Sequence, residues 1–186
     1  MYEKSVTDPS SFFLEHALKE LEWFEKPSVG YSGKITKPTW FKDGVLNIAH
    51  NCIDRHAAKN PNKIAIIWQG DEKENTKNIS YDQLLIEVSK LANGLKSIGV
   101  KKGDRVCIYM PMIPEAAYSM LACMRIGAIH SVVFGGFSPE AISSRILDSD
   151  CKYVITADEG IRGGKRVNLK ENIDIALKNC PNVQKT

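Results

Sequence analysis

Apolar residues follow two spacings along the second half of the chain, and the two alternate. Three short runs are apolar almost without interruption, as expected of strands buried on both faces of a parallel sheet. These runs cover residues 105–110, 129–134 and 152–157. Beyond each run the apolar positions change to helical spacing, and these helices are predicted to begin near Pro114, Ser138 and Lys170. The alternation predicts right-handed crossovers within one sheet.

The N-terminal region predicts one amphipathic helix and a long arm. The helix covers residues 10–25, with Ser10 or Ser11 as its cap and Pro27 closing it. Residues 26–44 are rich in glycine and proline and predict an irregular segment. A segment of this length usually wraps over a neighbouring surface.

Between this arm and the parallel strands, the pattern predicts two helices and a strand pair. One helix covers residues 46–59, and residues 63–69 and 78–80 form antiparallel strands at the edge of the sheet. Ser80 and Gln83 have the spacing of a capping box, in which each side chain satisfies a backbone N–H group. They open the second helix.

Together these elements predict an α/β fold. It is a partial doubly wound, mostly parallel sheet with flanking helices, preceded by the N-terminal helix and the extended arm. We expect residues 1–45 to form the helix and the arm, and residues 46–186 to form an incomplete α/β subdomain.

The composition of the chain argues against a nucleic-acid or membrane partner. At 43% hydrophobic and 25% charged residues, the chain can bury a core. The balance of 25 basic and 22 acidic residues gives a net charge of +3, which is too small to predict a nucleic-acid partner. No apolar run approaches the about 20 residues that span a bilayer, and the first residues lack a secretory signal. We therefore expect a cytoplasmic protein with no membrane partner.

The cysteines and histidines predict no metal site. Five cysteines are spread along the chain without a C-x-x-C pair, which is typical of reduced structural thiols in a cytosol. His50 and His56 stand six residues apart, so they do not share a helix face as a ligand pair would.

Ligands of open α/β sheets bind at the carboxyl ends of the strands, and two of the loops there are rich in proline or glycine. Met110–Pro114 is a stiff turn into a helix. Phe134, Gly135 and Gly136 instead allow backbone to approach a ligand closely, and the next helix offers free N–H groups to an anion. A tight strand-to-helix turn explains the glycines equally well. Ser138 is the cap of that helix, so we assign it no nucleophilic role.

The third loop, Asp158–Arg166, is the strongest candidate for an anionic ligand. It places Arg162, Lys165 and Arg166 around the adjacent glycines Gly163 and Gly164, and Lys170 adds a fourth cation. Arginine can bind a phosphate with two hydrogen bonds, and lysine contributes a point charge. The alternative is a solvated loop whose charge keeps it soluble.

Several catalytic signatures are absent from the sequence. There is no Walker A loop, no G-x-G-x-x-G, no H-E-x-x-H and no G-x-S-x-G. Asp158 and Glu159 are adjacent, so in an extended chain their carboxylates point apart. We therefore assign no catalytic residue.

Blocks of sequence from about Phe12 onward resemble the acetyl-coenzyme A synthetase family. This family comprises AMP-forming acetate–CoA ligases of the adenylate-forming superfamily. The blocks, in order, are WFKDGVLNIAHNCIDRHAAKNPNKIAIIWQGDE, ISYDQLL, KKGDRVCIYMPMIPEAAYSMLACMRIGAIHSVVFGGFSPEAISSRILDS and ITADEGIRGGKR. Propionyl-CoA and acetoacetyl-CoA synthetases are close relatives of the same pattern.

The resemblance implies a two-step reaction on small-molecule substrates. Acetate attacks the α-phosphate of ATP, and the thiol of coenzyme A then displaces AMP. It also implies that Arg162, Gly163, Gly164 and Lys165 hold the nucleotide end of coenzyme A, with Phe134, Gly135 and Gly136 against its adenine and phosphates. The family commonly has arginine at the position of Lys165, so one bidentate contact is lost there, although the adjacent Arg166 could replace it. It commonly has proline at the position of Asn168, so the loop is less stiff here.

The resemblance also implies that most of the active site lies elsewhere. In the family, the ATP loop, the acetate pocket and the C-terminal domain with its lysine lie beyond the part matched here. We therefore expect an N-terminal fragment that releases no pyrophosphate alone, with the ATP and Mg²⁺ sites outside it. Three alternatives stay open: a separate chain carries the rest of the ligase, the chain is a stand-alone coenzyme A or nucleotide-binding module, or it is a remnant of a broken gene.

Overall fold

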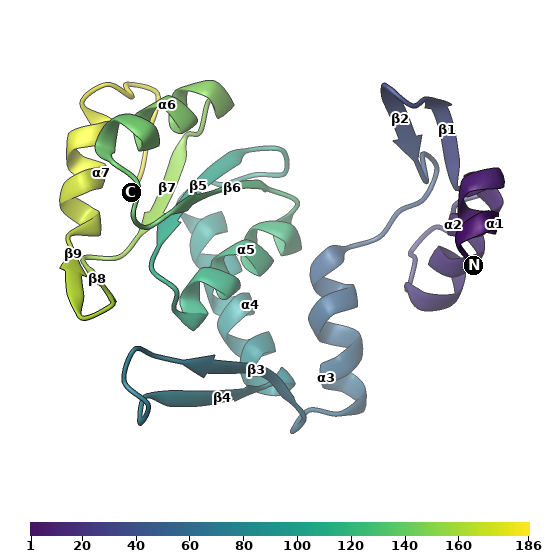
Figure 1. Cartoon of the computed structure of the whole chain (residues 1–186), viewed down its shortest axis with the longest axis horizontal. Helices are drawn as coiled ribbons and strands as arrows, with labels where there is room; N and C mark the ends of the chain where they lie inside the picture. Colours follow the sequence, from purple (N-terminus) through teal and green to yellow (C-terminus); the bar gives the residue numbers. More distant parts are fainter. The chain divides into compact units, whose positions relative to one another are not determined.

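The computed structural model describes residues 1–186 and divides the chain into two units, residues 1–51 and 52–186 (Figure 1). The domain division at residue 45 stays a prediction. No helix of the chain is both long and apolar enough to cross a membrane.

The first unit begins with two short helices, α1 (Tyr2–Thr7) and α2 (Pro9–Glu20). The predicted cap and end of the second were wrong. Asp8 is its cap, because its carboxylate accepts the N–H of Ser11 at 3.0 Å and Pro9 supplies the fixed φ of a first helical position. The helix ends before Leu21, whose backbone is extended, and not at the proline further on.

The arm is not irregular as predicted, since it contains a β-hairpin. Strand β1 (Tyr31–Lys34) pairs antiparallel with β2 (Lys37–Trp40). The ring of Trp40 lies 5.1 Å from that of Phe13 and 4.8 Å from that of Tyr31. Nearly every residue of the two strands is exposed, so no alternation of apolar and polar residues marks them in the sequence.

The second unit is the predicted α/β fold, and a π-helical turn η1 (His50–Asp54) runs into its first helix. Its elements in chain order are α3 (Arg55–Lys59), β3 (Ile64–Gln69), β4 (Thr76–Ser80), α4 (Tyr81–Ser97), β5 (Arg105–Met110), α5 (Pro114–Ile126), β6 (Ile129–Phe134), α6 (Pro139–Ser149), β7 (Tyr153–Thr156), β8 (Gly160–Arg162), β9 (Lys165–Val167) and α7 (Leu169–Leu177).

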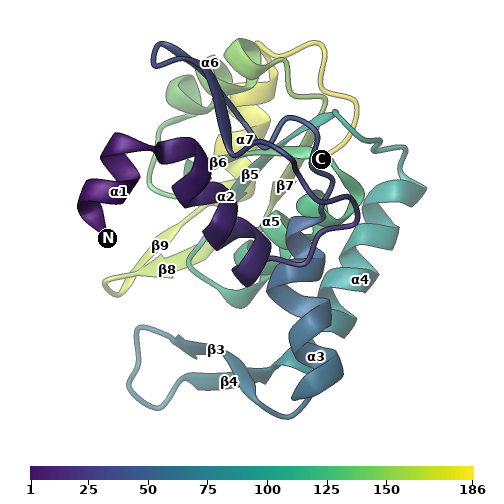
Figure 2. The same cartoon turned by 90° about the vertical axis from the view of Figure 1, so that its right-hand side faces the viewer.

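The parallel sheet has the strand order β6-β5-β7, which confirms the predicted α/β class. The chain moves from β5 to β6 through α5, then returns past β5 to β7 through α6. Because both crossovers of such a path are right-handed, the two helices lie on opposite faces. Accordingly α4 packs on α5 and α6 packs on α7, as Figures 1 and 2 show. The central strand β5 is buried along four consecutive residues.

Strands β3 and β4 pair antiparallel as predicted, but they are not the edge of this sheet. They form a separate two-stranded sheet. The indole N–H of Trp68 donates to the carbonyl of Met112 at 2.7 Å, so a side chain and not a strand ladder joins the pair to the loop after β5. Ser80 ends β4 and also caps α4 in the predicted capping box with Gln83, so the hairpin leads directly into a helix.

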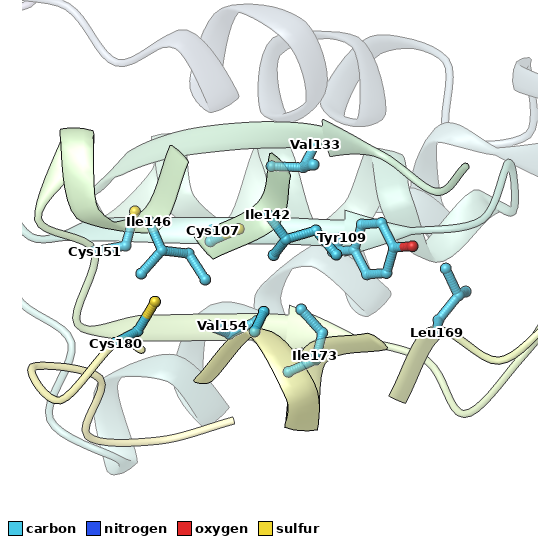
Figure 3. Close-up of a cluster of buried hydrophobic side chains, with 11 residues drawn as sticks. Cys107, Tyr109, Val133, Ile142, Ile146, Cys151, Val154, Leu169, Ile173 and Cys180 are labelled. Carbon is cyan, nitrogen blue, oxygen red and sulfur yellow. The ribbon is translucent and has the colours of Figure 1, made fainter. Parts of the chain in front are cut away.

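The core beneath the candidate site lies between the sheet and the helices α6 and α7 (Figure 3). Tyr109, Ile142 and Ile173 are completely buried in it. All five cysteines are free, and four of them are buried. Burial raises the pKa of the Cys107 thiol to about 12, with the neighbouring Cys151 and Cys180 contributing. Thiols in such an apolar setting are poor nucleophiles, because the thiolate is disfavoured.

Candidate functional site

Loops from three neighbouring strands meet at one edge of the parallel sheet. Met110 pairs with Phe134 at the ends of β5 and β6, and Tyr109 pairs with Thr156 at the end of β7. Because parallel strands end on the same side, the turn after β6 and the segment after β7 are brought to this edge. The topology thus brings the two glycine-containing segments to the same end of the sheet, as expected from the sequence.

The turn after β6 needs glycine because of close neighbours. A β-carbon on Gly136 would lie 2.8 Å from a ring carbon of Phe134, and one on Gly135 would lie 3.2 Å from the carbonyl oxygen of Met110. The N–H of Phe137 donates to the carbonyl of Phe134 at 3.0 Å and closes the turn. The predicted helix start is confirmed, since Ser138 caps α6 and proline follows it.

The segment after β7 is a β-hairpin and not the irregular loop expected from the sequence. Arg162 at the end of β8 pairs with Lys165 at the start of β9. Gly163 and Gly164 between them have φ angles of 56° and 72°, the left-handed values that a two-residue hairpin turn requires. The hairpin therefore presents Arg162 and Lys165 on either side of bare backbone.

Arg162 joins the two glycine turns. Its guanidinium carbon lies 4.7 Å from the centre of the Phe134 ring, in the geometry of a cation–π contact. A β-carbon at Gly136 would lie 3.4 Å from one of its terminal nitrogens, so the missing side chain leaves room for the guanidinium. At an exposed position such a contact contributes about 0.5–1 kcal/mol, enough to favour one orientation of a long side chain.

The other cations of this region differ in whether a carboxylate already pairs with them. Arg166 forms an ion pair with Glu159, and the ammonium of Lys170 lies 2.6 Å from a carboxylate oxygen of Asp174. Lys165 is exposed, and no ion pair or hydrogen bond to its ammonium is seen. Of the four cations predicted from the sequence, Arg162 and Lys165 are therefore the two without a carboxylate partner.

Two contacts at the site were not predicted from the sequence. The N–H of Gly164 lies 3.3 Å from a carboxylate oxygen of Asp71, which belongs to the turn between β3 and β4. The guanidinium carbon of Arg145 in α6 lies 5.2 Å from the centre of the Phe137 ring. The contact of Gly164 with Asp71 joins residues 93 positions apart, so no local pattern indicates it.

A groove elsewhere in the second unit is not part of this site. It has a volume of about 660 Å³ and is lined by residues of α4, α5 and the segment before β5. Lys101 and Lys102 lie on its wall and come just before β5, so the groove is at the opposite, amino end of the strands. None of the site residues predicted from the sequence lines it.

The turn glycines lead to a prediction about stability. Gly164→Ala should lower the free energy of unfolding by about 1 kcal/mol, because alanine is strained at a positive φ. Gly94→Ala is a matched control: it lies within α4, where a β-carbon would meet no atom within 4 Å, and should raise stability by about 0.5–1 kcal/mol. Urea unfolding of both variants checks this. A loss of equal size in both would contradict the assigned turn.

Comparison with known proteins establishes the family. A family model described as AMP-binding enzyme matches residues 53–185. The chain belongs to this family. A second model, described as Acetyl-coenzyme A synthetase N-terminus, matches residues 1–52. The resemblance drawn from the sequence blocks is thereby confirmed.

Similar curated proteins carry the name acetyl-coenzyme A synthetase. The protein of Gamma-proteobacterium EBAC31A08 is 55% identical over 186 residues, which is 100% of this chain and 29% of that protein. Acetyl-coenzyme A synthetase 2 of Pseudomonas aeruginosa is 57% identical over 185 residues, or 98% of this chain and 29% of that protein. The chain thus spans less than a third of the length of these relatives.

A solved structure has the same fold. Acetoacetyl-CoA synthetase from Streptomyces lividans matches with a TM-score of 0.89 at 22% sequence identity, covering 98% of this chain and 28% of that one. At this identity the likeness concerns the fold alone.

Proposed function

We propose that this chain supplies the coenzyme A-binding part of an AMP-forming acetate–CoA ligase. The observation that carries the proposal is the stacking of Arg162 on Phe134, which joins two glycine turns at the carboxyl edge of the parallel sheet. The names of the relatives support the same reaction class. The proposed binding residues are Arg162, Gly163, Gly164, Lys165, Phe134, Gly135 and Gly136.

Each proposed residue type matches a part of the ligand. The guanidinium of Arg162 can donate two parallel hydrogen bonds to a phosphate, and Lys165 adds a mobile positive charge. Gly163 and Gly164 leave backbone uncovered, because a β-carbon at either position would meet no atom within 4 Å, so that a bulky nucleotide can approach. Arg166 and Lys170 are less suited, because their charges are already paired with Glu159 and Asp174.

The proposed part in the reaction is binding and orientation. Coenzyme A would be anchored by its nucleotide end, leaving its thiol to displace AMP from an acyl-adenylate. Cations without carboxylate partners lower the cost of bringing a highly charged ligand to the protein. We propose no catalytic residue in this chain, and we place the ATP, Mg²⁺ and acetate sites of the complete enzyme outside these residues.

Calorimetric titration of the chain with coenzyme A and with 3′-dephospho-coenzyme A tests the proposal. We expect coenzyme A to bind about tenfold more tightly, since a charge-assisted contact to the 3′-phosphate contributes about 1.5 kcal/mol or more. Lys165→Ala should reduce this preference, whereas Lys178→Ala at the far end of α7 should not. Equal affinities would indicate a general nucleotide-binding module, and the absence of binding would contradict the proposal.

A further inference from the structure

The hydroxyl of Tyr109 lies directly beneath the Phe134–Gly136 turn. Tyr109 is the penultimate residue of β5, and its side chain is completely buried in the core of Figure 3. Its hydroxyl lies 3.0 Å from the carbonyl oxygen of Gly135 and 3.1 Å from that of Phe137. A buried phenol at the end of a central strand thus contacts the backbone of the turn at two points.

A third group reaches the same oxygen from α7. The side-chain amide of Asn172 donates to the hydroxyl of Tyr109 at 3.1 Å. A phenol has one proton to donate and lone pairs to accept, so the hydroxyl can share its proton between the two carbonyls while it accepts from Asn172. These part-buried polar groups are therefore satisfied together, and removing the hydroxyl leaves all of them without this partner.

Helix α7 also contacts the turn after β6 and the start of the hairpin that carries Arg162. Leu169, its first residue, is buried, and its methyl groups lie 3.4 Å and 3.3 Å from where β-carbons on Gly135 and Gly160 would stand. Gly160 is the first residue of β8 in the hairpin that carries Arg162. One helix thus packs against both the turn after β6 and the base of the hairpin.

We infer that Tyr109 and Asn172 are positioning residues. They hold the Phe134–Gly136 turn and α7 in fixed positions relative to each other, and thereby fix Arg162 over Phe134. The inference rests on the proposed function for its consequence in ligand binding, but the positioning itself is a property of the free chain. We assign Tyr109 no contact with the ligand, because its side chain is completely buried and its hydroxyl is bonded to two backbone carbonyls and to Asn172.

The positioning is measured first without ligand, by nuclear magnetic resonance. In the wild-type chain the Arg162 side-chain N–H signals should be displaced by the ring current of Phe134. Tyr109→Phe should move these signals and the Gly136 amide toward unstructured values, and Asn172→Ala should move them in the same direction by a smaller amount. Tyr118→Phe is the control, because it removes the hydroxyl of a buried tyrosine in α5.

The consequence for binding is measured by titration with coenzyme A. Tyr109→Phe should weaken binding about 5- to 10-fold, with Tyr118→Phe within about twofold of wild type. Unmoved Arg162 and Gly136 signals in Tyr109→Phe, or equal movement in Tyr118→Phe, would overturn the inference. Should Tyr109→Phe fail to fold, Asn172→Ala decides. If the wild-type chain binds no coenzyme A, the proposed function fails while the ligand-free spectra still decide the positioning.

Discussion

Arg162→Ala is expected to weaken coenzyme A binding by about 10- to 100-fold. Its guanidinium would otherwise donate charge-assisted hydrogen bonds to a phosphate, and the Phe134 ring holds it near the glycine turns. The variant should also lose the preference for coenzyme A over the 3′-dephospho ligand. Calorimetric titration with both ligands measures the two effects.

Two further variants separate charge from geometry at this position. Arg162→Lys keeps the charge but loses the planar fork, so we expect an affinity between those of wild type and Arg162→Ala. Lys178→Ala removes an exposed cation at the C-terminal end of α7 and should leave the affinity unchanged. Equal losses in Lys178→Ala and Arg162→Ala would show that only net charge matters, against the site assigned here.

Ile173→Ala is expected to lower the free energy of unfolding by about 3–4 kcal/mol. Ile173 in α7 is completely buried, and its truncation leaves a cavity in the core cluster that also contains Tyr109 and Ile142. Because α7 also carries Leu169 and Asn172, we expect this loss of packing to reduce coenzyme A affinity as well. Urea unfolding measures the stability.

Ile175→Ala supplies the matched control two residues along the same helix. Its side chain is 42% exposed, so the same chemical change should cost about 0.5–1 kcal/mol or less. Similar losses for Ile173→Ala and Ile175→Ala would contradict the orientation of α7 on the sheet. The comparison removes differences in helix propensity, because both substitutions replace isoleucine by alanine within one helix.

Most helices and strands of the second unit could be predicted because their signals are local. The capping box of Ser80 and Gln83 needs only residues three apart, and Gly127 ends α5 with a φ of 74° that other residues avoid. The apolar run of β5 reflects burial on both faces, which its neighbours β6 and β7 and the flanking helices provide. In these segments the local preference and the tertiary setting favour the same structure.

The hairpins β1–β2 and β8–β9 were missed for a different reason. The strands β1 and β2 are almost wholly exposed, so no burial pattern marks them. The strands β8 and β9 have three residues each, too few for periodicity, although Gly163-Gly164 is a recognised signal of a two-residue turn. The cap of α2 was missed although it could have been predicted, since Asp8-Pro9 combines a capping side chain with a proline at the first helical position.

The candidate site was predictable only as far as topology allows. The rule that ligands bind at the carboxyl ends of parallel strands is enough to place Phe134 and Arg162 near each other. The contact of Asp71 with the hairpin and the convergence of Asn172 on Tyr109 depend on residues 93 and 63 positions apart. Such contacts depend on how loops and helices pack against one another. The sequence pattern of a single element carries no information about this packing.

A crystal structure of the chain with coenzyme A tests the central claim most directly. We predict that the phosphates of the ligand lie within hydrogen-bond distance of the Arg162 guanidinium and the Lys165 ammonium, with its nucleotide against the Phe134–Gly136 turn. Coenzyme A bound at another surface, or Arg162 and Lys165 without any phosphate contact, would contradict the account.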